Sequence, residues 1–387
     1  MAEPHIVDGN RLTLLTEGPE RRRALIDLID RARRSLRLLF YIYADDESGR
    51  VVNAALARAA TRGVRVSLIV DGFGSDEASD AGFFEGLARV GVRVCRFSPR
   101  IGRRYLLRNH QKLAIADAEE AEPRLLTGGF NVEDDYFGTA REQAWRDLGL
   151  LVEGPAAGRI AGYYDALEEW VARSDGRLRH LNRALARWSE SEGKLRWLIG
   201  GPTRRLSPWA RTVRHDMRYG ERIDLIAAYF APSPTILRRL DRAGQRGKAV
   251  RVVTAAKSDN DATIAAARFT YRGLLRKGVR VFEYLPTKLH TKLYVVDDAV
   301  HIGSANFDMR SLFINLELML RIEDAAFAAM ARRYVDGEVA ASREVTLDAY
   351  REATGWWQRA KQFAAYLVVG VLDPTVSRGL NFGIDED

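Results

Sequence analysis

The segment TRGVRVSLIV at residues 61–70 decides the fold, because a similar segment, QRGKAVRVVT, occurs at residues 245–254. In both segments a helix ends at an Arg-Gly pair and a valine-rich strand follows at once. Another apolar strand precedes each copy, LRLLFYIY (36–43) in the first half and IDLIAAYF (223–230) in the second. Elements that recur in the same order predict a duplicated domain.

The repeat extends beyond these segments. The residues GVRV occur at 91–94 and again at 278–281, and Pro99 and Pro286 stand eight residues beyond the two glycines. Strands that alternate with helices of about 10 to 15 residues indicate parallel β-α-β units with right-handed crossovers. We therefore expect an α/β fold with two duplicated lobes, whose mixed, mostly parallel sheets are flanked by helices.

The length of 387 residues suits two domains that each bury a core, and 47% hydrophobic with 29% charged residues is typical of folded proteins. We place an N-terminal lobe at 1–165 and a C-terminal lobe at 195–350. A polar helical connector at 166–194 joins them, and a C-terminal segment follows at 351–387.

The net charge of +8 favours anionic partners such as phospholipid surfaces, nucleic acids or phosphorylated substrates, although a modest positive balance is also common in arginine-rich proteins. Cys95 is the one cysteine, which excludes an intramolecular disulfide and a thiolate metal cluster. The first residues lack a secretory signal pattern, and no stretch of 18 or more apolar residues occurs. We therefore expect a chain that does not span a membrane.

Each copy of the repeat contains a His-x-Lys-x4-Asp motif, HQKLAIAD at 110–117 and HTKLYVVD at 290–297. Alternate residues of a strand share a face, so histidine and lysine project together and can both meet one phosphate. The aspartates of the motifs, Asp117 and Asp297, lie five residues beyond the lysines. We expect them to be structural and to bind backbone or a basic side chain.

A glycine turn with an asparagine follows each motif, GGFN at 128–131 and GSAN at 303–306. Glycine lets the backbone approach a ligand, and a carboxamide can donate to a phosphoryl oxygen. Farther on, Asp147 and Glu317 supply one carboxylate per copy. A buried carboxylate beside a histidine fixes its tautomer and raises its basicity.

A single histidine near a strand is usually a packed or surface residue, but two matched motifs with the same companions make coincidence a poor explanation. A metal site is the main competitor. Lysine is a poor ligand at neutral pH, and the motifs provide no dense cluster of Asp, Glu or Cys. We therefore expect chemistry without a metal or another cofactor.

These residues resemble the phospholipase D superfamily, and most closely the bacterial cardiolipin synthases of the phospholipase D type, in a short form without N-terminal transmembrane helices. The resemblance covers about Asn10 to Asn381. Beyond the motifs it rests on Leu15 to Glu20, Arg108-Asn109-His110, Trp145-Arg146-Asp147, Ile302 to Ser311 and Asn315 to Glu317. It implies that the two motifs meet at a pseudo-twofold interface and form one active site, for which a monomer suffices.

The resemblance also implies a mechanism and a role for each site residue. His110 attacks phosphorus and forms a phosphohistidine, and His290 acts as the acid and base. Asp147 orients His110, and Glu317 orients His290. The residues expected to hold the phosphate oxygens are Lys112, Lys292, Asn131, Asn306 and Ser304. Transfer of a phosphatidyl group from phosphatidylglycerol to a second phosphatidylglycerol gives cardiolipin.

Two segments are candidates for contact with a membrane. Residues 356–372 combine Trp356 and Trp357 with Arg359, Lys361 and an apolar run, and they fit either an interfacial helix or a helix buried against a lobe. The arginine-rich insertion at 99–110 suits lipid headgroups or is a solvated loop. We expect anionic phospholipid partners and a peripheral location at the cytoplasmic face of the membrane, or otherwise in the cytoplasm.

Other functions remain open at this point. With water as the acceptor, the same chemistry gives a phospholipase D-type hydrolase or a nuclease. No aromatic-basic repeat or separate nucleic-acid module is evident, which makes nucleic acid an improbable partner. A purely binding role does not explain why both motifs are complete.

Overall fold

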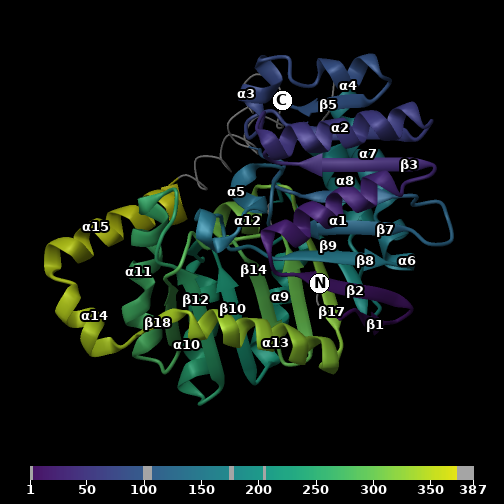
Figure 1. Cartoon of the computed structure of the whole chain (residues 1–387). Coiled ribbons are helices and arrows are strands. Elements are labelled where there is room, and N and C mark those ends of the chain that lie inside the picture. Colours follow the sequence, from purple (N-terminus) through teal and green to yellow (C-terminus); the bar gives the residue numbers. More distant parts are fainter. Residues whose placement is uncertain (1–2, 99–106, 174–177, 204–205, 373–387) are drawn as a thin grey trace.

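The computed structural model describes residues 3–98, 107–173, 178–203 and 206–372. Two lobes lie against each other, and their strands run in different directions (Figure 1). Each lobe contains an eight-stranded sheet. The N-terminal sheet has the order β1-β2-β8-β7-β6-β3-β4-β5. Its strands are β1 His5–Val7, β2 Asn10–Leu15, β3 Ser35–Phe40, β4 Arg65–Asp71, β5 Arg93–Phe97, β6 Leu113–Ala116, β7 Arg124–Gly128 and β8 Gly149–Glu153.

The C-terminal sheet has the order β18-β13-β12-β10-β14-β15-β17-β9. Its strands are β9 Leu195–Gly200, β10 Arg222–Ala227, β12 Ala249–Ala255, β13 Arg280–Tyr284, β14 Lys292–Val296, β15 Ala299–Gly303, β17 Glu317–Glu323 and β18 Ser342–Val345. A separate pair joins β11 (Phe230–Ala231) to β16 (Phe307–Asp308). Seven strands from β2 to β5 match seven from β9 to β13 in order, with β1 and β18 added at opposite edges. The predicted duplication is confirmed.

Helices cover the outer face of each sheet. In the N-terminal lobe these are α1 Gly18–Asp30, α2 Glu47–Thr61, α3 Asp76–Asp80, α4 Glu85–Arg89 and α5 Asp134–Phe137, with a 3₁₀ turn at Ala140–Glu142. In the C-terminal lobe they are α9 Pro208–Tyr219, α10 Pro234–Gln245 and α11 Asp261–Leu275, with α12 Met309–Phe313 beside the sheet, and α14 Leu347–Ala353 and α15 Trp356–Leu367 packed on α11. A π-helical turn, η2 (Val368–Leu372), follows α15.

The expectation of mixed sheets flanked by helices is confirmed, but the expectation that they are mostly parallel is wrong. Parallel pairing is confined to β3-β4-β5 in one sheet and β10-β12-β13 in the other. The remaining neighbours in both sheets are antiparallel. For the motif strands β6 and β14 the reason is that short turns, rather than helical crossovers, connect them to β7 and β15, and a short turn reverses the chain.

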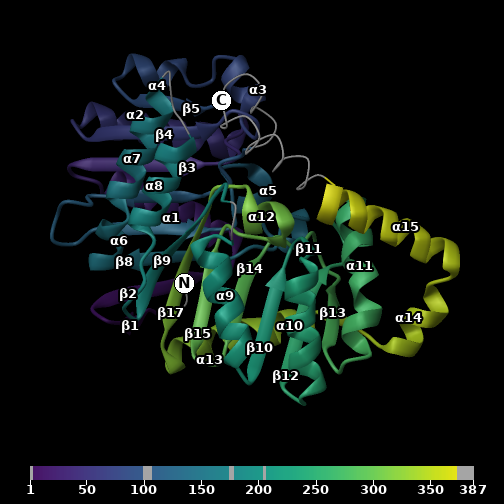
Figure 2. The ribbon, with the colours of Figure 1, turned by 180° about the vertical axis from the view of Figure 1, so that it is seen from behind.

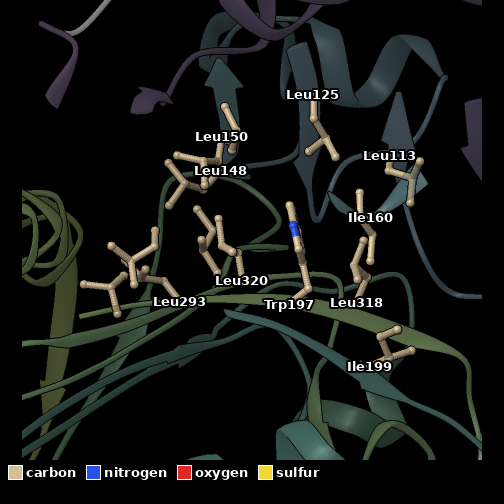
Figure 3. Close-up of a cluster of buried hydrophobic side chains, with 14 of the residues drawn as sticks. Leu113, Leu125, Leu148, Leu150, Ile160, Trp197, Ile199, Leu293, Leu318 and Leu320 are labelled. Carbon is tan, nitrogen blue, oxygen red and sulfur yellow. The ribbon is translucent and has the colours of Figure 1, made fainter. Parts of the chain in front are cut away.

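The inner faces of the two sheets share one hydrophobic core. Figure 3 shows leucines of the N-terminal strands, among them Leu125 and Leu150, facing Trp197, Leu318 and Leu320 of the C-terminal sheet. The Trp197 indole N–H donates to the carbonyl of Ala156 across this boundary, at 2.8 Å. Fully burying one such leucine contributes about 2 kcal/mol. The shared core therefore holds the two lobes in one arrangement.

The stretch between the lobes contributes to this core. Four helices complete the inner layer: α6 Pro155–Arg159, α7 Ala161–Ala172, α8 Leu178–Trp188 and α13 Ala325–Ala340. Tyr163 and Leu167 of α7 and Leu181 and Leu185 of α8 are buried in the same cluster as the strand residues. The segment expected to be a polar connector thus has one strongly apolar side, which covers the junction of the two sheets.

Candidate active site

The two lobes exchange backbone hydrogen bonds where the motif histidines lie. The amide of His110 donates to the carbonyl of Leu316 at 3.0 Å, and the amide of Leu316 donates to the carbonyl of Arg108 at 2.9 Å. The second lobe repeats the arrangement. His290 donates to the carbonyl of Arg146 at 2.7 Å, and Arg146 donates to that of Lys288 at 2.8 Å. Each histidine is therefore held in a short parallel pairing with the chain of the opposite lobe.

These pairings bring each histidine to the carboxylate of the other copy. The Nδ1 atom of His110 lies 3.1 Å from both oxygens of Glu317. The Nδ1 atom of His290 lies 2.7 Å from Oδ2 of Asp147. The predicted pairs, Asp147 with His110 and Glu317 with His290, are wrong. The physical reason is the cross-lobe pairing, which places Glu317 directly after Leu316 and beside His110, and Asp147 directly after Arg146 and beside His290.

Both lysines of the motifs are fully buried at this site. Lys112 Nζ donates to the carbonyl of His110 at 2.6 Å, and Lys292 Nζ donates to the carbonyl of His290. Each bond uses one of the three N–H groups that an ammonium carries. The two His-Lys pairs that the repeat predicts are therefore brought together with two carboxylates in one composite site.

The two carboxylates have different surroundings. Ser304 donates its hydroxyl to Oε2 of Glu317 at 2.5 Å, and Ser311 donates to Oε1 at 2.7 Å. At the position equivalent to Ser304 the first lobe has Gly129, where an added Cβ would lie 2.5 Å from Oδ1 of Asp147. The hydroxyl of Ser304 donates to Glu317 because the turn passes directly beside that carboxylate, and its predicted role in binding the phosphate stays a prediction.

Comparison with known proteins identifies the family. The family described as "Cardiolipin synthase, PLD-like domain" matches residues 25–156 and 217–338, which include both motifs and both carboxylates. The chain belongs to this family.

Similar proteins carry the same description. The chain is 29% identical to "Cardiolipin synthase B" of Salmonella typhi over 376 residues, which cover 93% of this chain and 87% of the relative. It is also 29% identical to "Cardiolipin synthase 1" of Bacillus anthracis over 361 residues, or 89% of this chain and 69% of the relative. The similarity therefore extends across both lobes.

Solved structures share the fold. The crystal structure of phosphatidylserine synthase from Haemophilus influenzae Rd KW20 has a TM-score of 0.75 at 13% identity, and covers 93% of this chain and 95% of its own. A polyphosphate kinase from Porphyromonas gingivalis has a TM-score of 0.56 at 15% identity, over 92% of this chain and 56% of its own. At these identities the likeness concerns the arrangement of the two lobes.

Burial dominates the electrostatics of this cardiolipin synthase-family site. Burial, and then the charge of Lys292, lower the pKa of His290 to about 3, against the opposing effect of Asp147. Burial and the charges of both motif lysines also lower the pKa of His110. Since Lys292 acts on both histidines, the two halves form one electrostatic unit. Burial lowers the pKa of Lys292 itself to about 8.

The carboxylates respond differently to the same burial. Burial raises the pKa of Glu317 to about 7, although Lys112, Ser304 and Ser311 favour its ionised form. For Asp147 burial also acts upward, but the charges of His290 and Lys292 outweigh it, and its pKa lies below the ordinary value. Asp147 is therefore ionised throughout the neutral range, whereas Glu317 exchanges its proton within that range.

The aspartates of the motifs are structural, as expected. Asp117 accepts hydrogen bonds from the backbone amides of Arg33, Arg34 and Ser35. Asp297 accepts those of Glu221 and Arg222 in the same way. Both aspartates fasten the turn before the first parallel strand of their lobe, and they contact neither histidine in the part of the chain that the structure describes.

The two asparagines of the glycine turns are buried near the site but are not equivalent. Asn131 accepts a hydrogen bond from the amide of Ile42 at 3.1 Å. The Oδ1 atom of Asn306 is buried and has no hydrogen-bond partner among the described residues. Their predicted role in holding phosphate oxygens stays a prediction.

Several aromatic rings lie near the histidines, and these contacts were not predicted from the sequence. Tyr136 and Trp145 stand edge to face with His290 at 5.1 Å between ring centroids, and Tyr229 lies at 6.4 Å. Tyr41 contacts His110 in the same manner at 5.1 Å. The three tyrosines follow no spacing that links them to the motifs, so sequence carried little signal for them, whereas Trp145 stands two residues before Asp147 in a segment that carries the resemblance. They surround the imidazoles with apolar surface and cause much of the burial.

Two further expectations bear on the site. Among the residues that the structure describes, no group of three or more His, Cys, Asp or Glu side chains could hold a metal ion. No described helix combines the length and apolar character needed to cross a bilayer. Most of the arginine-rich insertion, 99–106, lies outside the described residues; at its end, the guanidinium of Arg108 stacks over Phe73 at 4.1 Å from the ring centroid.

Proposed function

We propose that the protein is a phosphatidyltransferase that makes cardiolipin from two molecules of phosphatidylglycerol through a phosphohistidine intermediate. The observation that carries this proposal is the crossed arrangement of two His-Lys pairs and two carboxylates in one buried site. The names of the relatives, cardiolipin synthase 1 and cardiolipin synthase B, support the choice of substrate. We further propose that the protein works at the cytoplasmic face of the membrane, where it binds peripherally.

The hydrogen bonds of the histidines determine which ring nitrogen reacts. Each Nδ1 faces a carboxylate and donates its proton to it, which leaves Nε2 as the nitrogen that meets the substrate. Before the reaction Nε2 of His110 holds a free electron pair, and Nε2 of His290 holds a proton. In the first step, Nε2 of His110 attacks phosphorus and the bond from phosphorus to the glycerol oxygen breaks. The Nε2 proton of His290 passes to that oxygen, and glycerol leaves.

The second step reverses these roles. Nε2 of His290 removes the proton from the free hydroxyl of a second phosphatidylglycerol as its oxygen attacks phosphorus. The nitrogen–phosphorus bond to His110 breaks, cardiolipin leaves, and His290 again holds a proton. The two steps convert two phosphatidylglycerol molecules into one cardiolipin and one glycerol.

The different carboxylates support His110 as the nucleophile and His290 as the acid. An acid needs a stabilised imidazolium, and Asp147 is an ionised partner at 2.7 Å. The phosphate of the bound substrate adds negative charge in the site and favours the same form. A nucleophile must be neutral, and burial with the nearby lysines disfavours a charge on both histidines. His290 has the ionised Asp147 to oppose this effect, whereas the carboxylate beside His110 has a pKa of about 7.

The lysines provide the electrostatic stabilisation. Negative charge grows on the nonbridging oxygens as phosphorus becomes five-coordinate, and preorganised donors in a buried site act most strongly at that point. Lys112 and Lys292 each retain N–H groups beyond the one that they donate to the backbone. We propose that these groups, with the carboxamides of Asn131 and Asn306, bind those oxygens.

The test is expression in a bacterial host that lacks cardiolipin, followed by mass spectrometry of the lipid extract. We expect cardiolipin to appear with the native chain and to be absent with His110→Ala. If phosphatidic acid appears in place of cardiolipin, the protein is a hydrolase and not a transferase. If nucleic acid is degraded and the lipids do not change, the protein is a nuclease.

A further inference from the structure

Helix α15 lies against the C-terminal lobe by one narrow face. Tyr366 donates its hydroxyl to the carbonyl of Pro232 at 2.9 Å, and its ring packs on Phe269. The buried Gln362 accepts a hydrogen bond from the Tyr350 hydroxyl at 2.8 Å. In Figures 1 and 2 the helix runs beside α11 at the outer edge of the lobe. The packing fixes which side of α15 faces outward.

The outward side is apolar. Trp356 is 69% exposed, Trp357 65%, Phe363 46% and Val368 54%, and the two indoles stack with their ring centroids 4.0 Å apart. Large apolar side chains are usually scattered singly over a protein surface, so three on one short helix and a fourth on the turn that follows it need an explanation. Of the two alternatives for this segment, an interfacial helix and a helix buried against a lobe, the exposed apolar side fits the first.

The charges of this segment have one sign. Between Trp356 and Leu372 the sequence contains Arg359 and Lys361 and no aspartate or glutamate. The chain has 52 acidic residues, so a segment with exposed side chains and no acidic residue gives this part of the surface a positive charge. Indole rings and basic side chains together suit the headgroup region of a bilayer with anionic lipid.

The end of α15 points toward the active site. The turn η2 continues the helix and packs against α12. Helix α12 holds Ser311, whose hydroxyl bonds Glu317 and so reaches His110 through one carboxylate. The C-terminal end of the docking helix is therefore connected to the active site through α12.

We propose that the outward side of α15 and of the turn after it, formed by Trp356, Trp357, Lys361 and Val368 with Phe363 at its edge against Phe269, docks on the surface of a bilayer that contains anionic phospholipid. The proposal rests on the proposed function, because it supplies the contact that a lipid transferase needs. The 12 residues of the helix span about 18 Å, which is too short to cross a bilayer. The helix therefore lies in the plane of the interface.

A second copy of the chain is a weaker occupant. A face about 18 Å long and roughly 10 Å wide offers on the order of 200 Å². A stable protein interface buries about 800 Å² on each partner. A bilayer has no such requirement, because a few interfacial aromatic and basic side chains already give reversible binding.

The test compares Trp356→Ala/Trp357→Ala with a control variant, Ile6→Ala/Tyr219→Ala, which removes two exposed apolar side chains elsewhere. Each full-length protein is sedimented with vesicles of phosphatidylglycerol and phosphatidylcholine. We expect the tryptophan variant to bind at least about tenfold more weakly and the control variant to bind like the native chain. Turnover of a short-chain, monomeric phosphatidylglycerol should be the same in all three.

Two readouts keep the docking surface separable from the proposed function. His290→Ala should bind vesicles as the native chain does although it turns nothing over. Vesicles should shift the tryptophan fluorescence of the native chain to the blue, and the shift should be lost in the tryptophan variant. Unchanged vesicle binding by that variant would overturn the proposal, and so would a native dimer that the variant converts to monomers. If no cardiolipin forms but vesicle binding still depends on the two tryptophans, the proposed function is wrong and the proposed docking surface is kept.

Discussion

The half of the active site around His290 and the half around His110 share a backbone frame but differ in how they hold a carboxylate. Asp147 meets His290 in a single short contact at 2.7 Å, next to Gly129. Glu317 is one methylene longer and divides its two oxygens among His110, Ser304 and Ser311. One carboxylate serves mainly its histidine, and the other is the centre of a small hydrogen-bond network.

This difference shows how two copies of one fold can take different chemical roles. A glycine in one copy and Ser304 in the other occupy equivalent positions of the turn. Asp147, beside the glycine, is ionised because His290 and Lys292 outweigh its burial. Glu317, beside the serine, has a pKa near 7 because burial outweighs Lys112 and the serine hydroxyls. Two histidines with the same neighbours in sequence thereby acquire different tendencies to hold a proton, which is what an acid and a nucleophile require.

The largest expected effect separates the two histidines. With a phosphatidyl substrate that carries a good leaving group such as p-nitrophenol, His290→Ala should still form the phosphohistidine on His110, because departure then needs no acid. The adduct should accumulate, since no base activates the acceptor. His110→Ala should form no adduct. Rapid quench and peptide mass spectrometry measure this, and an adduct on His290 would reverse the assignment.

The next effect compares the carboxylates. Asp147→Asn should lower kcat by about 10³-fold, because an amide neither fixes the tautomer nor stabilises the imidazolium of His290. Glu317→Gln should cost about 10²-fold, since Ser304 and Ser311 can still hold the side chain in place. Steady-state kinetics on folded protein test the order. Equal losses in the two variants would mean that the extra hydrogen bonds of Glu317 have no role in turnover.

A smaller effect appears in the pH profile. Glu317 must be ionised to accept the Nδ1 proton of His110, so kcat/KM should rise with pH through about 7. It should fall again above about 8 as Lys292 loses its charge. The Ser304 hydroxyl stabilises the ionised carboxylate, so Ser304→Ala should raise the pKa of Glu317. One hydrogen bond of about 1 kcal/mol corresponds to an upward shift of about 0.7 pH unit.

The control for this shift is Ser233→Ala, which removes a hydroxyl that caps α10. Its profile should coincide with that of the native protein. An acidic limb that stays in place in Ser304→Ala would show that a group other than Glu317 titrates there.

Sequence reasoning was most successful where information was local. The recurrence of segments 61–70 and 245–254 predicted the duplication, and the strand orders of the two sheets agree with it. The two-residue spacing of His and Lys predicted that they lie together, although His110, Lys112 and His290 precede the strands that follow them rather than lying in them. The overestimate of parallel pairing came from applying the β-α-β pattern of β3 and β4 to strands that are joined by short turns.

The pairing of histidines with carboxylates could not be read in this way. Asp147 lies 37 positions after His110 but 143 before His290, and proximity along the chain favoured the wrong partner. The correct pairs depend on backbone bonds between lobes, which involve residues such as Leu316 and Arg146 that have no chemical signature. The ring of Tyr136 was missed for the same reason, because it meets His290 of the opposite lobe only once the lobes are assembled.

The smallest effect concerns the aspartates that end the two motifs, and it falls on stability. Asp117 is buried and binds the amides of three residues, whereas Asp297 is exposed and binds those of two. Asp117→Ala should therefore lower the free energy of unfolding by about 2 kcal/mol and Asp297→Ala by about 1 kcal/mol, as urea titrations would measure. Turnover per folded molecule should stay within about twofold of native in both, because neither side chain reaches a histidine. A large loss of kcat in a stable Asp297→Ala protein would instead show that this aspartate takes part in the chemistry. The two motifs would then differ in the role of their aspartates as well as of their histidines.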